Sequence, residues 1–110
     1  MTEPTIDAAT FAELEAAAGA DFARELIATF LEEAPLMLAE LRSTLAAGNA
    51  DAFRRVAHSL KSNSLTFGAL TLGAMARELE TTGMSGTASL DALAGEYARA
   101  AAALTALRDA

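Results

Sequence analysis

The chain has 110 residues, enough for one domain with its own apolar core, and it contains no cysteine, which excludes disulfides, thiol catalysis and thiolate metal sites. Its formal net charge of -7 argues against a general nucleic-acid-binding or anionic-membrane-binding protein. No apolar run approaches the roughly 18 residues of a membrane span, and the first residues lack the segments of a signal peptide, so a cytoplasmic protein is expected.

The first two predicted helices lie in the first half of the chain. Abundant alanine, only two prolines and few β-branched residues favour helix throughout. A short helix is expected from Asp7, a suitable N-cap, to about Ala18. A longer helix is expected from about Asp21 to Ala47, and Pro35 within it should kink it rather than break it, because the apolar stripe keeps its phase on both sides. This stripe has spacings of three and four residues and consists of Phe22, Leu26, Phe30, Ala34, Met37, Leu41 and Leu45.

Three further helices are expected in the second half. Asn49 is a good N-cap for a third helix that runs to about Phe67, and the fifth helix should end near Arg108. A loop is expected from Thr81 to Ser89. The apolar faces of the fourth and fifth helices are formed by Leu72, Met75, Ala76 and Leu79, and by Leu90, Leu93, Ala94, Tyr97, Ala101 and Leu104. No strand pattern competes.

The expected fold is therefore all-α. Four long amphipathic helices joined by short connections predict an antiparallel four-helix bundle, and the short first helix should cap it. No internal repeat or low-complexity linker divides the sequence, so residues 1–110 are expected to form a single domain.

The only histidine, His58, lies on the third predicted helix. On a helical wheel, His58 falls about 140° from the buried position Phe53, so it is predicted to point toward solvent. Lys61 and Ser62, three and four residues later, lie on the same surface, and Leu65 lies nearly above His58. An isolated exposed leucine is common, but a leucine among polar groups also suits a transient docking surface. The buried face of this helix is predicted to comprise Phe53, Val56, Ala57, Leu60, Ser64 and Phe67.

The histidine lies in a basic part of an acidic chain. Between Asp51 and Arg77, the only acid is Asp51 itself, against the basic residues Arg54, Arg55, Lys61 and Arg77. This distribution is compatible either with simple solvation of one helix face or with a docking patch for an acidic partner.

Several kinds of chemistry are excluded by the motifs that the sequence lacks. One histidine without cysteine or an H-x-x-x-H pair provides too few ligands for a metal site. No G-x-S-x-G elbow supports serine catalysis, and no glycine-rich phosphate-binding motif supports ATP binding. The chemistry that remains is that of a nucleophilic imidazole on a rigid helix, beside one cation.

The segment HSLKSNSLTFG, residues 58–68, resembles the phosphoacceptor helix of histidine phosphotransfer (HPt) domains of two-component phosphorelays. The usual family pattern is H-x-L-K-G-x-[SA], with a glycine ten residues after the histidine. Residues 30–61 are similar to the second and third helices of the family, and ARELE, residues 76–80, to the fourth. Ser62 replaces the usual glycine, and because serine is also small, slightly altered docking is expected rather than a loss of function.

The resemblance implies that Nε2 of His58 exchanges a phosphoryl group with an aspartate of a receiver domain. Lys61 would neutralise the phosphoryl charge. Glu80 is the candidate acceptor for the other ring nitrogen and Arg77 a candidate contact to phosphate or partner, although each is equally compatible with a solvated surface charge. Docking to the partner is assigned to Ser62, Leu65, Arg54 and Arg55, the two arginines through long-range steering.

The expected partners are receiver domains of response regulators, hybrid histidine kinases, or both, and no nucleic acid or membrane. The Mg²⁺ that transfer requires would belong to the receiver, so no cofactor or metal is expected on this chain. A free-standing monomer is expected. Two alternatives stay open: a helical interaction module that accepts no phosphate and tolerates replacement of His58, and the phosphoacceptor domain of a larger histidine kinase. A structural subunit with an idle histidine is less favoured.

Overall fold

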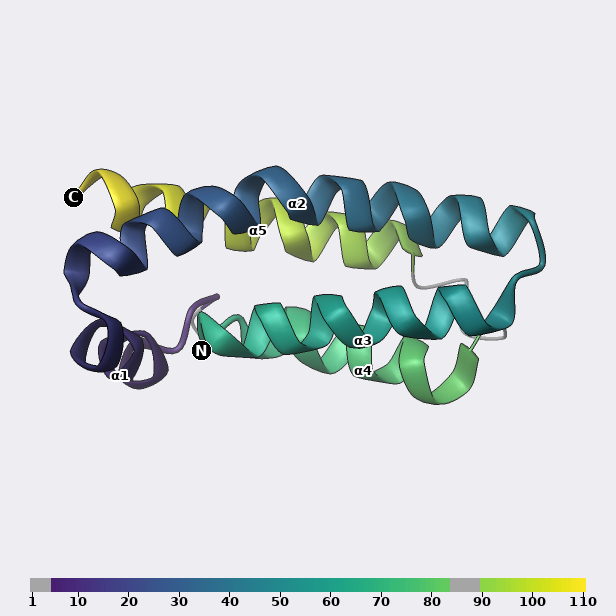
Figure 1. The fold of residues 1–110 in the computed structure, drawn as a ribbon, viewed down its shortest axis with the longest axis horizontal. Coiled ribbons are helices and arrows are strands. Elements are labelled where there is room, and N and C mark those ends of the chain that lie inside the picture. Colours follow the sequence, from purple (N-terminus) through teal and green to yellow (C-terminus); the bar gives the residue numbers. More distant parts are fainter. Residues whose placement is uncertain (1–4, 84–89) are drawn as a thin grey trace.

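The computed structural model describes residues 5–83 and 90–110, and these residues form five α-helices and no strand (Figure 1). The helices are α1 (Ala8–Ala18), α2 (Ala20–Ala46), α3 (Ala50–Thr66), α4 (Leu70–Thr82) and α5 (Leu90–Asp109). The all-helical prediction is confirmed, and so are the limits expected for the first three helices, to within one residue. None of the described helices is long and apolar enough to span a membrane.

The loop that the sequence predicted from Thr81 to Ser89 begins later than expected. Helix α4 continues through Thr82, and Gly83 follows it with a φ of 64°. The rest of the predicted loop, residues 84–89, lies outside the described residues.

Side-chain caps begin two of the helices, as the sequence predicted. Asp7 accepts hydrogen bonds from the backbone N–H of Thr10 at 3.0 Å and from its hydroxyl at 2.6 Å, and Asn49 accepts one from the N–H of Ala52 at 3.1 Å. Each cap satisfies a first-turn donor that has no partner within its own helix. The hydroxyl of Thr10, followed by its N–H, holds the pKa of Asp7 below its ordinary value.

Helix α2 runs through Pro35 without a break, as the continuous apolar stripe indicated. Because proline has no N–H, it leaves the carbonyl of Leu31, four residues earlier, without its helical donor. The hydroxyl of Tyr97 on α5 lies 3.5 Å from that oxygen, at the limit of a hydrogen bond. Helix α5 thus offers a donor to the carbonyl that the proline leaves free.

The apolar core lies where the helices face one another. Helix α2 packs against α3 and α5, α4 packs against the same two helices, and α1 packs against α2 and α3 (Figure 1). The largest fully buried apolar side chains come from α2 to α5 and are Ile27, Leu41, Phe53, Leu60, Leu72, Leu79, Leu93 and Leu104.

Burial departs most from the predicted pattern at two positions. Phe22 was expected in the buried stripe of α2, but it is 51% exposed, because the first turns of α2 direct Ala23 and Ile27 toward the core instead. Glu96 on α5 is buried although it is charged. Its carboxylate accepts two hydrogen bonds from Arg99, at 3.0 and 2.8 Å, which compensates for the lost hydration.

Candidate functional site

His58 lies on α3 and points away from the core. Its neighbours Ala57 and Leu60 are fully buried, and helical periodicity therefore turns position 58 outward. The side chain of His58 is 57% exposed. The predicted outward orientation is confirmed.

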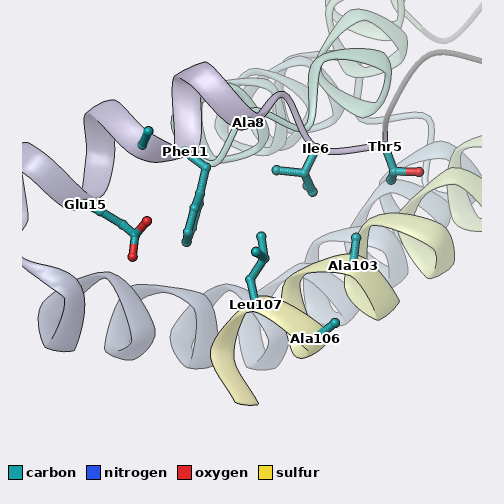
Figure 2. A pocket seen from close by; sticks show the side chains of 9 residues that line it. Thr5, Ile6, Ala8, Phe11, Glu15, Ala103, Ala106 and Leu107 are labelled. Carbon is teal, nitrogen blue, oxygen red and sulfur yellow. The ribbon is translucent and has the colours of Figure 1, made fainter. Parts of the chain in front are cut away.

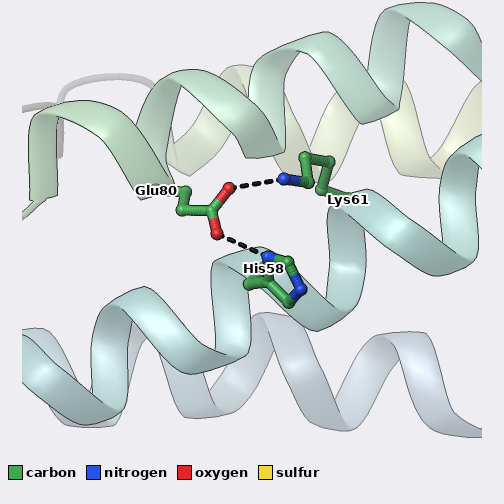
Figure 3. Close-up of polar contacts among 3 residues, drawn as sticks. All are labelled: His58, Lys61 and Glu80. Carbon is green, nitrogen blue, oxygen red and sulfur yellow. Dashed lines mark hydrogen bonds and ion pairs between the residues drawn. The ribbon is translucent and has the colours of Figure 1, made fainter.

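Glu80 on α4 connects His58 to Lys61 (Figure 3). Its Oε2 lies 2.5 Å from Nδ1 of His58, and its Oε1 accepts a hydrogen bond from Nζ of Lys61 at 2.7 Å. His58 and Lys61 are one turn apart on α3, and α3 packs along α4, so two neighbouring side chains of one helix reach one carboxylate on the other. The sequence left the contacts of Glu80 open, and the structure places Glu80 against the histidine.

Both contacts favour the ionised form of Glu80. The hydrogen bond from Lys61 is the largest effect that lowers the pKa of Glu80 from its ordinary value of 4.5; partial desolvation opposes it, and the hydrogen bond with His58 lowers the pKa further. An ionised carboxylate only accepts hydrogen bonds. The hydrogen of a neutral His58 ring therefore lies on Nδ1, and its lone pair lies on Nε2.

The free nitrogen of His58 faces away from this carboxylate. In Figure 3 the ring turns its second nitrogen to the side opposite Glu80. The site thus offers an oriented imidazole with an available lone pair, beside an ammonium group that shares its anchoring carboxylate. Such a group can act as a nucleophile toward an electrophile that another molecule presents.

A hollow of about 420 Å³ lies beside the histidine. His58, Ser59 and Glu80 line it together with two arginines, Arg54 and Arg55. The structure therefore brings both arginines next to His58, where the sequence had suggested only long-range steering.

The remaining candidate residues lie on the outer faces of α3 and α4. Ser62 is exposed one turn after His58, and Leu65 is 42% exposed. Arg77 is exposed on α4. Sequence reasoning missed Gly73 on α4: a Cβ there would lie 2.6 Å from Cδ2 of Leu65, so the absence of a side chain lets this leucine lie against α4.

The rest of the described surface offers fewer groups that could react or bind a metal. No group of three or more metal-ligating side chains occurs in residues 5–83 and 90–110. A larger hollow, of about 650 Å³, lies between α1 and the end of α5 (Figure 2), and side chains such as Ile6, Phe11 and Leu107 make it mainly apolar. The size of a hollow does not by itself identify a reactive site. The imidazole that a charged side chain orients, that of His58, lies at the smaller hollow.

Known proteins resemble the chain over most of its length. The family model described as the Hpt domain matches residues 25–110. Among solved structures, the chain is similar to the crystal structure of histidine-containing phosphotransfer protein B (HptB) from Pseudomonas aeruginosa PAO1, with 28% sequence identity and a TM-score of 0.89, over 98% of this chain and 97% of that chain. A search of curated proteins found no match.

Proposed function

The chain belongs to the Hpt domain family, and we propose that it carries a phosphoryl group on Nε2 of His58, received from and passed to the aspartate of a receiver domain. The observation that supports this proposal most directly is the contact between Nδ1 of His58 and Glu80, because it leaves the lone pair on Nε2, the nitrogen on the side opposite Glu80 (Figure 3). The proposed partners are receiver domains of response regulators, hybrid histidine kinases, or both.

In the proposed step, the lone pair of Nε2 attacks the phosphorus of an aspartyl phosphate. The P–N bond forms as the P–O bond to the aspartate breaks, and the carboxylate leaves with the electron pair. Nδ1 keeps its hydrogen, and the charge of Glu80 offsets the positive charge that develops on the ring. The reverse transfer uses the same groups, and positioning contributes more than covalent help from the protein.

Lys61 is the proposed electrostatic partner of the arriving phosphoryl group. Its side chain is 22% exposed, and its Nζ bonds Glu80. An ammonium has three donors on a flexible stem, so Lys61 can reach a phosphoryl oxygen and still keep its bond to the carboxylate. We propose no cofactor on this chain and assign the Mg²⁺ requirement to the receiver.

The phosphorylated protein should be long-lived once it is separated from its donor. Glu80 bonds Nδ1 and Lys61, and it lies on the side of the ring opposite Nε2 (Figure 3). It is therefore poorly placed to activate a water molecule at phosphorus.

Phosphorylation by a receiver, followed by removal of the receiver, tests this function. The proposal predicts a phosphate that is labile in acid, stable in base and retained after the donor is removed. Rapid loss of the phosphate from the isolated protein would count against a carrier.

We also propose that α2 to α5 form the antiparallel four-helix bundle of a single domain, with α1 as its cap, and that the protein acts as a cytoplasmic monomer. The packing of α2 and α4 against both α3 and α5 supports the bundle, and the exposure of His58 suits a monomer whose α3 faces its partner. Sedimentation at the mass of two chains, with His58 covered, would contradict the monomer.

A further inference from the structure

Ion pairing divides the basic side chains of this acidic protein into two groups. The chain has eight arginines and lysines against 15 acidic residues. Five of the basic side chains form ion pairs with carboxylates, namely Arg24, Arg42, Lys61, Arg99 and Arg108. The other three, Arg54, Arg55 and Arg77, form no hydrogen bond or ion pair within residues 5–83 and 90–110.

The three unpaired arginines gather around the candidate site. Arg54 and Arg55 lie one turn before His58 on α3, and Arg77 lies one turn before Glu80 on α4. All three arginines are exposed. The unpaired positive charge of the described chain is therefore concentrated where the proposed phosphoryl transfer takes place.

The two arginines of α3 have different surroundings. The guanidinium of Arg54 reaches the end of α4, since its Nη2 lies 3.0 Å from the position that a Cβ at Gly83 would occupy. Arg55 lines the hollow beside His58 and also a second hollow of about 340 Å³, which it shares with Met37 and Glu40. Arg55 thus lies between two concave surfaces, whereas the guanidinium of Arg54 lies against the end of α4.

We infer that the hollow beside His58 receives an acidic side chain of the receiver domain, and that Arg55, assisted by Arg54, binds its carboxylate. The inference rests on the proposed function. A guanidinium binds carboxylates in a favourable two-pronged geometry. The carboxylate that already lines the hollow, Glu80, is bonded to Lys61, so it does not satisfy the arginines.

The net negative charge of this chain explains why arginines are needed at the hollow beside His58. A receiver that holds Mg²⁺ beside its acceptor aspartate does so with carboxylates, and a chain of net charge -7 repels an acidic surface at long range. Unpaired arginines around His58 reverse this repulsion locally. They act mainly on the rate of association and on the orientation of the partner.

The test compares wild type with Arg55→Gln and Arg55→Glu, using the receiver that transfers fastest to wild type among a panel of phosphorylated receiver domains. The second-order rate constant of transfer to Arg55→Gln should fall about fivefold at low salt and depend less on salt, and Arg55→Glu should fall further. At a saturating concentration of the receiver, the rate of transfer to both Arg55 variants should return to that of wild type. Arg24→Gln is the matched control, because Arg24 is an exposed arginine paired with Asp21 on α2, and its rate constant should stay at the wild-type value.

Two results would overturn the inference, and a different one would contradict the proposed function. An unchanged salt dependence in both Arg55 variants would overturn the inference. A lower rate that persists at saturating receiver would also overturn it, because Arg55 would then act on the phosphoryl group itself. Labelling of His58 by phosphoramidate, which needs no docking, shows whether each variant keeps a folded, reactive site. Failure of wild type to accept phosphate from every donor would instead contradict the proposed function.

Discussion

Oε2 of Glu80 lies 2.5 Å from Nδ1 of His58, although 22 residues separate the two in the sequence. The second oxygen of the same carboxylate bonds Lys61, so one side chain on α4 orients two side chains on α3. These three residues form a coupled unit, and a change in any one of them alters the surroundings of the other two.

Glu80→Gln should slow phosphoryl transfer about 10- to 100-fold, the range found when a metal-bound histidine loses the partner that orients its ring. The amide has one acceptor oxygen and no charge, so its NH2 group would take the place of one of the two oxygens that now face His58 and Lys61. Single-turnover transfer measures the rate, and ¹⁵N NMR of the ring reports which nitrogen carries the hydrogen. Glu78→Gln, an exposed acid on the same helix, is the control. A wild-type rate and tautomer in Glu80→Gln would contradict the orienting role.

Lys61→Ala should slow transfer on the order of 100-fold, because the reacting phosphoryl group loses the positive charge of the ammonium group placed beside it. Lys61→Arg should retain part of the rate. In Lys61→Ala the pKa of Glu80 should rise toward 4.5, since the hydrogen bond from Lys61 is the largest cause of its lowering. An NMR titration of the Glu80 carboxyl checks the pKa, and an unchanged value would show that the contact is not formed in solution.

Acid should weaken the fold through Asp7 and Glu80. Hydrogen bonds lower the pKa of both groups from their ordinary values of 3.8 and 4.5. Each carboxylate therefore contributes stability that is full above its unfolded pKa and is lost as the pH falls through the lower folded pKa. Urea unfolding from about pH 6 to about pH 3 should show a smaller loss of stability in Asp7→Asn and in Glu80→Gln than in wild type. Parallel curves for all three proteins would contradict this.

Gly68→Ala should destabilise the protein more than Gly48→Ala does. Both glycines have positive φ, 81° and 69°, but a Cβ at Gly48 meets nothing within 4 Å, whereas one at Gly68 would lie 2.8 Å from the carbonyl oxygen of Asp7. The backbone conformation alone should cost about 1 kcal/mol at Gly48, and the clash should raise the cost to about 2–3 kcal/mol at Gly68. Urea denaturation measures both free energies of unfolding, and equal losses would contradict the argument.

The sequence predicted what depends on local periodicity. The limits of α1 to α3, the caps at Asp7 and Asn49 and the outward direction of His58 all follow from residue spacing within one helix. Phe22 was placed wrongly because the burial of a helix end depends on which neighbours cover it, and spacing does not give that information.

Contacts between helices could not be predicted in the same way. Whether Glu80 meets His58 depends on the register of α4 against α3, and the sequence alone does not determine that register. The family motif includes the glycine at position 68 but does not explain it. The explanation is the close approach of Asp7, which begins a helix that lies fifty residues or more away in the sequence. The sequence showed that Arg54 and Arg55 belong to a basic segment, but only the structure shows that they share a hollow with the histidine.

Phosphoryl transfer from a panel of phosphorylated receiver domains to wild type and to His58→Gln, with the acid and base stability of the label as the readout, tests most directly whether His58 carries phosphate. We expect a base-stable, acid-labile phosphate on wild type and none on His58→Gln. The absence of label on wild type from every receiver domain of the panel, with binding retained by both proteins, would contradict the carrier and favour a helical interaction module.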